Sequence, residues 1–229
     1  MKRTRIKICG FTDANPALSA VEAGADAIGL NFVSQSPRVV TAEKAQIILK
    51  ALPAFVEPVA LFCDASTEQI ISTTRELGIR TVQLHGQEPL SFASYLSPLR
   101  IIKALPFDDK FGHEVDVWSE RCDNLAGIIV DAPPKDGLTG GTGVAIDWDK
   151  LATMKQKHWP PLILAGGLTP ENVGQAIAKV KPYGVDVASG GVATKVVAMS
   201  MAGSNISPSI GQFEVRVQCQ GAILMTQRR

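Results

Sequence analysis

Short apolar runs alternate along the chain with longer segments in which apolar residues recur every three or four positions. The runs predict strands and the periodic segments predict helices. Strands are expected at residues 5–9, 26–32, 58–63, 80–85, 100–105, 126–131, 161–165 and 185–189. Helices are expected near residues 14–23, 41–52, 66–77, 87–96, 113–122, 147–157 and 170–180. Because successive strands are joined by helical segments, the pattern favours a parallel sheet.

Eight strands in this alternation predict an α/β fold, a single-domain (β/α)8 barrel of the TIM type. An open, doubly wound sheet is the alternative, because the hydrophobic pattern does not show whether the sheet closes. In a barrel of this type the chemistry lies at the carboxyl ends of the strands. Functional residues are therefore expected where a strand gives way to the loop that follows it.

Capping residues mark several element boundaries. Thr41 and Ser66 suit the N-cap position of the helices that follow them, and Thr169 before Pro170 predicts a helix with proline as its first residue. Glycine stands between a helix end and a strand start at three joints: Gly24, Gly78 and Gly184. A left-handed C-terminal cap explains this recurrence, since glycine adopts positive φ without steric cost.

Composition narrows the range of partners. The 229 residues carry 23 basic and 22 acidic side chains, a net charge of +1, so no broad basic field for nucleic acid is present. No apolar run reaches the roughly 18 residues of a membrane span, and the run after the basic first residues is too short for a secretion signal. The four cysteines lack zinc-type spacing. We expect a cytoplasmic protein without a metal, a nucleic-acid partner or a membrane partner.

The first strand carries a candidate nucleophile or base. Lys7 and Cys9 share one face of this strand, while Ile6 and Ile8 point the other way. If the isoleucine face meets helices, Lys7 and Cys9 face the barrel interior. A nearby ammonium group favours the thiolate, so Lys7 is expected to activate Cys9. The alternative is a small buried cysteine that behaves as a hydrophobic residue.

Three further residues end strands or follow them closely. Asp131 ends an apolar strand, where a carboxylate is costly to bury without a partner or a task; a loop-capping role is the alternative. His85 ends the fourth strand and suits acid–base chemistry or a structural hydrogen bond. Arg38 follows the second strand, where it suits a carboxylate ligand or an ordinary surface position.

Glycine clusters follow the last three predicted strands. They are Gly140-Gly141-Thr142-Gly143, Gly166-Gly167 and Ser189-Gly190-Gly191. Loops of this kind after the seventh and eighth barrel strands suit a phosphate group, because bare backbone N–H groups can approach its oxygens. Tight turns that need positive φ explain each cluster singly but not their placement.

Taken in order, the motifs resemble the phosphoribosylanthranilate isomerase family. The matching segments are KICGFT (7–12), GADAIGLNFVSQSPRVV (24–40), VQLHGQE (82–88), IIVDA (128–132), GGTGVAIDW (140–148), LAGGLTPENV (164–173) and GVDVASG (184–190). The resemblance implies an Amadori rearrangement of N-(5-phosphoribosyl)anthranilate to 1-(2-carboxyphenylamino)-1-deoxyribulose 5-phosphate. It makes Asp131 the general acid and Cys9 the general base, with no metal or redox cofactor.

The same resemblance implies the substrate contacts. Arg38 is expected to hold the anthranilate carboxylate, and the glycine loops are expected to hold the phosphate. The residues expected to bind substrate are Arg38, Gly166, Gly167, Asp186, Ser189 and Gly190, with supporting roles for Lys7, His85 and Gly141. The partner is thus a small-molecule substrate, and both a monomer and a homodimer fit the sequence.

The resemblance ends at Gly190. The family continues with a glutamate and an amphipathic helix, whereas Ala193 stands here in place of that glutamate, and Lys195 is the only charge in 192–213. We therefore divide the chain into a catalytic barrel, 1–190, and a C-terminal segment, 191–229. This segment is either a divergent terminus that covers a neighbouring surface or the product of a late change of reading frame, and the second case would compromise the phosphate loop at 189–191.

Two other functions fit parts of the pattern. A pentulose-phosphate epimerase shares the phosphate loops but needs metal-binding histidines and aspartates at several strand ends, and of the three histidines only His85 is so placed. A phosphate-binding barrel without activity is the non-enzymatic alternative, suggested by the unusual C-terminal segment.

Overall fold

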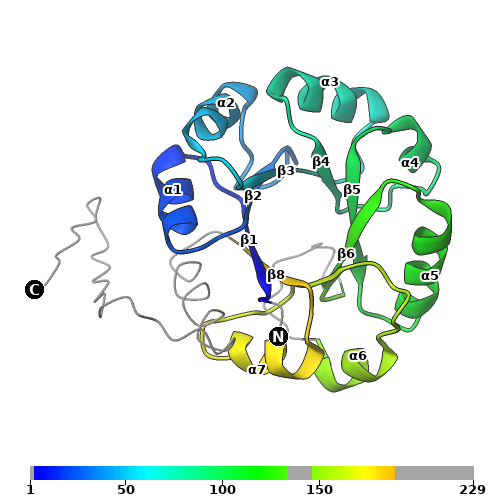
Figure 1. Ribbon diagram of the computed structural model, residues 1–229. Helices are drawn as coiled ribbons and strands as arrows, with labels where there is room; N and C mark the ends of the chain where they lie inside the picture. Colours follow the sequence, from blue (N-terminus) through cyan, green and yellow to red (C-terminus); the bar gives the residue numbers. More distant parts are fainter. Residues whose placement is uncertain (1–2, 134–145, 189–229) are drawn as a thin grey trace, which may run out of the picture.

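The computed structural model shows eight parallel strands closed into a barrel inside a ring of helices (Figure 1). The structure describes residues 3–133 and 146–188. The strands are β1 (Arg5–Cys9), β2 (Ala27–Asn31), β3 (Glu57–Phe62), β4 (Thr81–Leu84), β5 (Arg100–Pro106), β6 (Leu125–Asp131), β7 (Leu162–Leu164) and β8 (Gly184–Ala188). The helices of the described part are α1 (Ala14–Glu22), α2 (Ala42–Ala51), α3 (Thr67–Leu77), α4 (Phe92–Tyr95), α5 (Phe111–Arg121), α6 (Trp148–Met154) and α7 (Val173–Val180).

The barrel closes through β1, which pairs in parallel with both β2 and β8. In the β1–β8 pairing Lys7 stands opposite Asp186, and in the β1–β2 pairing Cys9 stands opposite Gly29. The predicted single-domain (β/α)8 barrel is therefore confirmed, and the open sheet is excluded. Every predicted strand is present, with ends within one residue of those expected.

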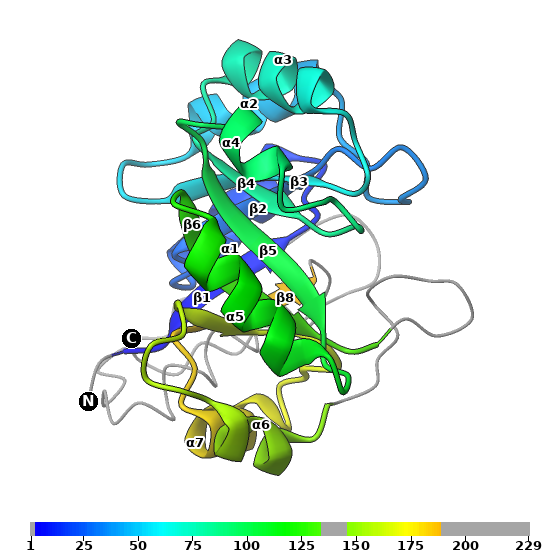
Figure 2. The same cartoon turned by 90° about the vertical axis from the view of Figure 1, so that its right-hand side faces the viewer.

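Two apolar layers hold the barrel together. The larger lies between strands and helices, where Ile101 and Leu105 of β5 belong to the same buried cluster as Trp118 of α5. Figure 2 shows α5 against the outside of the barrel beside β5. The smaller layer fills the barrel interior and consists of Val59, Ile102, Ala104, Ile129, Ile163 and Ala165. Strand residues point alternately outward to the helices and inward to the barrel interior. At the carboxyl ends of the strands, the inward positions can hold polar side chains.

The predicted capping chemistry is mostly confirmed. The Thr41 hydroxyl accepts a hydrogen bond from Lys44 N, and Gly78 caps α3 in the left-handed conformation with φ 69°. The third glycine joint was predicted wrongly, because Gly184 lies within β8 and Lys181 takes the left-handed position with φ 48°. A Cβ at Gly184 would lie 3.1 Å from Arg5 O, so close strand packing accounts for this glycine.

Three helices are shorter than the sequence pattern suggested, and one of them is α6, which was expected at 147–157 and spans Trp148–Met154. The helix expected from Pro170 begins only at Val173, because Asn172 accepts a hydrogen bond from Thr169 N and donates one to Gly167 O, which forms a separate turn. The helix expected at 87–96 is reduced to α4, since Gln87 and Glu88 both bind Asp64 in the loop after β3.

No helix within the described ranges is long and apolar enough to cross a membrane. The division at residue 190 and both hypotheses about 191–229 concern a segment that lies outside the described residues.

Candidate active site

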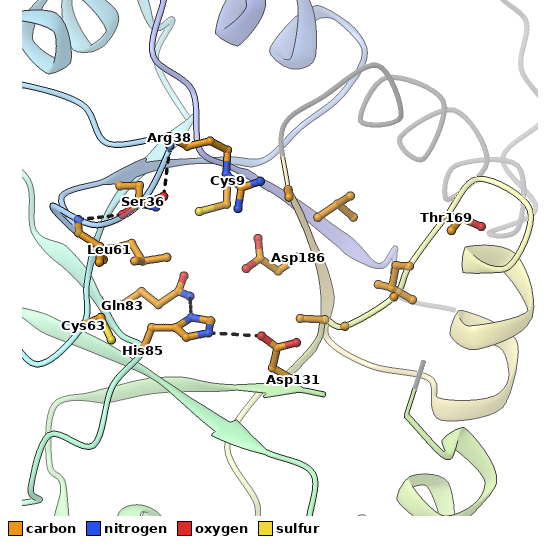
Figure 3. A pocket seen from close by; sticks show the side chains of 18 residues that line it. Cys9, Ser36, Arg38, Leu61, Cys63, Gln83, His85, Asp131, Thr169 and Asp186 are labelled. Atoms are coloured by element: carbon orange, nitrogen blue, oxygen red, sulfur yellow. Dashed lines mark hydrogen bonds and ion pairs between the residues drawn. The ribbon is translucent and has the colours of Figure 1, made fainter. Parts of the chain in front are cut away.

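A cavity of about 400 Å³ opens at the carboxyl ends of the strands (Figure 3). It brings together seven of the predicted site residues: Cys9, Arg38, His85, Asp131, Gly166, Gly167 and Asp186. These residues come from β1, β6 and β8 and from the loops after β2, β4 and β7. Gly141, Ser189 and Gly190 lie outside the described residues. Lys7 lies deeper in the barrel, bound to Asp186.

A buried ion pair between neighbouring strands lies below the cavity, and only its aspartate lines the cavity. Lys7 Nζ donates to Asp186 Oδ1 at 2.8 Å, and the two side chains are 5% and 9% exposed. Burial alone lowers the pKa of Lys7, but the Asp186 carboxylate and Cys9 more than reverse this, so the pKa of Lys7 is raised and the ammonium form is retained. The pair thus keeps one positive and one negative charge directly beneath Cys9.

The pKa of the Cys9 thiol differs from the expectation. Burial raises the pKa of its thiol; Lys7 lowers that pKa, but the Asp186 carboxylate raises it again, and the net result lies above the usual value for a thiol. The predicted influence of Lys7 is present, yet the prediction of a ready thiolate is wrong for the substrate-free site. Desolvation outweighs one nearby ammonium when that ammonium is already paired.

Gly29 makes room for Cys9 from the adjacent strand. A Cβ at this position would lie 2.6 Å from Cys9 Sγ and 3.0 Å from Cys9 Cα, closer than packed atoms approach. Sequence analysis missed this residue, because only the β1–β2 register places it beside the thiol.

Asp131 is held from two sides at the end of β6. Its Oδ1 accepts a hydrogen bond from Ala132 N at 2.8 Å, and its Oδ2 lies 3.3 Å from His85 Nε2. Gln83 Nε2 lies 2.9 Å from His85 Nδ1. With the Gln83 amide donating to Nδ1, the imidazole proton lies on Nε2 and faces Asp131. Gln83 was not predicted as a site residue. The feature that could have revealed it is a polar residue at an inward position of β4, two residues before His85.

The loop after β2 shapes the position of Arg38. Asn31 Nδ2 donates to Ser36 Oγ at 2.9 Å, and Ser36 Oγ also accepts from Arg38 N at 3.2 Å. Val40 N donates to Asn31 O and returns the chain to the end of β2. Figure 3 shows Arg38 beside Cys9 at the rim of the cavity. Asn31, the last residue of its strand, is a further site residue that sequence analysis missed.

The loop after β7 carries two glycines with positive φ, 72° at Gly166 and 60° at Gly167. A Cβ at Gly166 would lie 2.8 Å from Ala132 N and 3.0 Å from Asp131 Oδ1. Both the backbone conformation and the space beside Asp131 therefore require glycine at 166. Within residues 3–133 and 146–188, no three histidine, cysteine or carboxylate side chains are grouped so that they could hold a metal ion.

The comparisons with known proteins agree with this geometry. The family profile of N-(5'-phosphoribosyl)anthranilate (PRA) isomerase matches residues 6–195. The chain belongs to the N-(5'-phosphoribosyl)anthranilate isomerase family. An enzyme of this name from Geotalea daltonii is 45% identical over 188 residues, which cover 82% of this chain and 86% of the relative. The chain is therefore an aldose–ketose isomerase of tryptophan biosynthesis, and the epimerase and non-enzymatic alternatives are set aside.

Solved structures of phosphoribosylanthranilate isomerases show the same barrel. One, in complex with reduced 1-(o-carboxyphenylamino)-1-deoxyribulose 5-phosphate, superposes with a TM-score of 0.74 at 30% identity and covers 87% of this chain and 99% of its own. Another, of monomers generated from the dimeric enzyme of Thermotoga maritima, gives a TM-score of 0.71 at 29% identity and covers 88% of this chain and 98% of its own.

Replacement of Gly29 tests how closely the isomerase depends on the position of Cys9. In Gly29→Ala the added methyl displaces Sγ, and we expect kcat to fall by about tenfold or more, because Cys9 is predicted to be the general base and a displacement of about 1 Å at a reacting group can cost a hundredfold. Steady-state kinetics measure the change. Gly174→Ala in α7 is the matched control, since a Cβ there meets nothing within 4 Å. Equal kinetics in the two variants would refute the requirement.

Proposed function

We propose that the cavity binds N-(5-phosphoribosyl)anthranilate and rearranges it with Asp131 as general acid and Cys9 as general base. The observation that carries this proposal is their convergence: Cys9 from β1 and Asp131 from β6 line one cavity, with Arg38 at its rim and Gly166 beside Asp131. In Figure 3 Cys9 and Asp131 lie on different walls of the cavity, and the Asp186 side chain is drawn between them. A substrate placed between them meets an acid on one side and a base on the other.

The first step is opening of the ribose ring. Asp131 donates its proton to the ring oxygen while the bond between that oxygen and C1 breaks. The nitrogen lone pair of the anthranilate forms a double bond to C1, which gives a protonated imine. Asp131 is left as a carboxylate, and the His85 Nε2–H facing its Oδ2 stabilises the new negative charge.

The second step is removal of the proton on C2. Cys9 takes this proton, the C2–H electrons form a C1=C2 double bond, and the imine electrons return to nitrogen. The product is a neutral enolamine, because the protonated imine is the electron sink. Protonation at C1 and loss of the C2 hydroxyl proton then give the ketone, so that substrate and product have the same atoms.

Each end of the substrate carries an anionic group, and each is proposed to meet hydrogen-bond donors of the protein. The Arg38 guanidinium suits the anthranilate carboxylate, since it presents paired donors to a planar anion. The backbone of Gly166 and Gly167 suits the phosphate, because no side chain blocks approach to the peptide N–H groups. The relative crystallised in complex with reduced 1-(o-carboxyphenylamino)-1-deoxyribulose 5-phosphate supports a ligand of this class.

Substitution of Arg38 tests the orientation of the substrate. In Arg38→Ala we expect KM to rise about tenfold to a hundredfold with a smaller change in kcat, since a hydrogen bond to a charged group contributes about 1.5–3 kcal/mol. The decrease in substrate fluorescence during turnover measures both constants. Arg80→Ala is the control, because Arg80 is exposed just before β4, at the opposite end of the barrel. An unchanged KM in Arg38→Ala would contradict the proposed carboxylate contact.

The proposed setting of the enzyme is the cytoplasm. Among the described residues, Cys9 and Cys122 are free thiols, as suits a reducing compartment. Monomer and homodimer both remain predictions for this chain, and light scattering on the purified protein distinguishes them. The dimeric relative from Thermotoga maritima supports the second.

A further inference from the structure

A second buried ion pair lies behind the wall of the active site. Lys103 Nζ is 2.7 Å from Glu88 Oε2, and the two side chains are 4% and 1% exposed. Lys103 points outward from β5 into the layer between barrel and helices, since its neighbours Ile102 and Ala104 face the interior. Its Nζ lies 5.8 Å from the ring centroid of Trp118 on α5. Neither charged residue lines the cavity.

The two charges bind the peptide groups on either side of His85. Lys103 Nζ donates to Leu84 O at 3.4 Å and to Gly86 O at 2.6 Å. The Glu88 carboxylate accepts from Gly86 N, at 3.1 Å to Oε1 and 3.0 Å to Oε2. His85 N itself donates to Phe62 O at 2.8 Å. The backbone of residues 84–86 is therefore fixed by groups that do not touch the cavity.

The same pair joins this loop to the preceding one. Glu88 Oε1 also accepts from Asp64 N at 2.9 Å, and Asp64 Oδ1 accepts from Gln87 N at 2.6 Å. At Gly86 a Cβ would overlap the Asp64 carboxylate and lie 2.7 Å from Asp64 N. The contact is thus too close for any side chain at 86, which leaves the loop little freedom to shift.

Burial of two charges is costly, and an ion pair of this kind contributes little net stability compared with apolar side chains of the same volume. Stability alone is therefore a weak reason for this pair. Its contacts define instead the backbone of the residue whose Nε2 faces Asp131 at 3.3 Å. A shift of His85 would remove the N–H group that faces Oδ2 of the carboxylate formed by Asp131 and leave only the Ala132 N–H on Oδ1.

We propose that Glu88 and Lys103 are positioning residues of the isomerase, which hold His85 against Asp131 from behind the barrel wall. The inference rests on the proposed role of Asp131 as general acid. Substrate affinity depends on other groups, the Arg38 guanidinium and the glycine backbone, so loss of the pair acts on kcat and leaves KM nearly unchanged.

The test is a double variant, Glu88→Gln/Lys103→Met, which removes both charges and keeps similar volumes, so that no unpaired charge stays buried. We expect kcat to fall by about tenfold to a hundredfold with KM within about twofold, because a small displacement of a catalytic group has effects of this size. Asp149→Asn/Lys179→Met is the matched control, since it removes an exposed ion pair between α6 and α7 and is expected to keep both constants. Melting curves fix a temperature at which all variants are folded.

Two measurements separate positioning from a general structural effect. In a His85→Ala background the double substitution is expected to cause no further loss of kcat, because residues that act through one another are not additive. In ¹⁵N spectra the imidazole nitrogens of His85 are expected to shift in the double variant, while those of His113 and His158 keep their positions. If the double variant does not fold, Glu88→Asp keeps both charges while shortening the side chain, and the same changes are expected to a smaller extent.

A folded variant with unchanged kcat, an equal loss in the His85→Ala background, or unchanged His85 nitrogen signals would overturn the inference. The spectra do not depend on turnover. Failure of the positioning role is therefore distinct from failure of Asp131 as the acid, which appears as full activity in Asp131→Asn.

Discussion

Replacement of Asp131 by asparagine is expected to reduce kcat by about a thousandfold, within the range of roughly 10²–10⁴ that general acid–base catalysis contributes. The amide keeps the size of the side chain and can still accept the hydrogen bond from Ala132 N, so the end of β6 is preserved. It has no acidic proton for the ribose ring oxygen. Ring opening then depends on water, while binding through Arg38 is unaffected and KM stays nearly constant.

Asp147→Asn is the matched control for this exchange. Asp147 is the N-cap of α6, where its carboxylate accepts from Lys150 N, and asparagine is an equally good N-cap residue. The same chemical change away from the cavity should leave kcat and the melting temperature close to those of the wild type. Wild-type turnover in a folded Asp131→Asn protein would show that another group protonates the ring oxygen.

The strands were predictable because their signal is local. Each apolar run is bounded by helical periodicity, and all the predicted strands occur within one residue of their expected ends. Closure was predicted from the count of eight strands and not from the hydrophobic pattern, since it depends on the pairing of Arg5–Cys9 with Gly184–Ala188 across nearly the whole chain. The shortened start of α7 was missed for a related reason, because Asn172 uses its side chain to close a turn that the pattern counted as helix.

The site was predictable as far as it follows from strand ends. Cys9 and Asp131 each end a strand and His85 follows one directly, so the barrel hypothesis alone placed them on one face. Contacts between strands could not be predicted from the sequence, because they depend on the strand register. One register places Gly29 beside Cys9, and another pairs Lys7 with Asp186. The pKa of Cys9 was misjudged because the cost of desolvation depends on three-dimensional burial, which a spacing of two residues does not reveal.

Substitution of Cys9 is the second change expected to have a large effect. In Cys9→Ser we expect kcat to fall by about 10²–10⁴-fold, because a hydroxyl group is far less readily ionised than a thiol and cannot act as the base. Serine fits the space beside Gly29, so folding is expected to be retained. Cys63→Ala is the control, since its thiol also lines the cavity but comes from the end of β3, away from Lys7.

The pH dependence of the wild-type enzyme identifies Cys9 as the base more directly. Its pKa is raised by burial, so the thiolate is a minor species at neutral pH, and its fraction grows as the pH increases toward that raised value. We therefore expect log(kcat/KM) to rise by about one unit per pH unit on the side controlled by the base. The same limb should be present in Cys63→Ala and absent from the residual activity of Cys9→Ser. A limb that survives in Cys9→Ser would assign the base to a different group, whereas its loss there ties C2 deprotonation to the thiol above the Lys7–Asp186 pair.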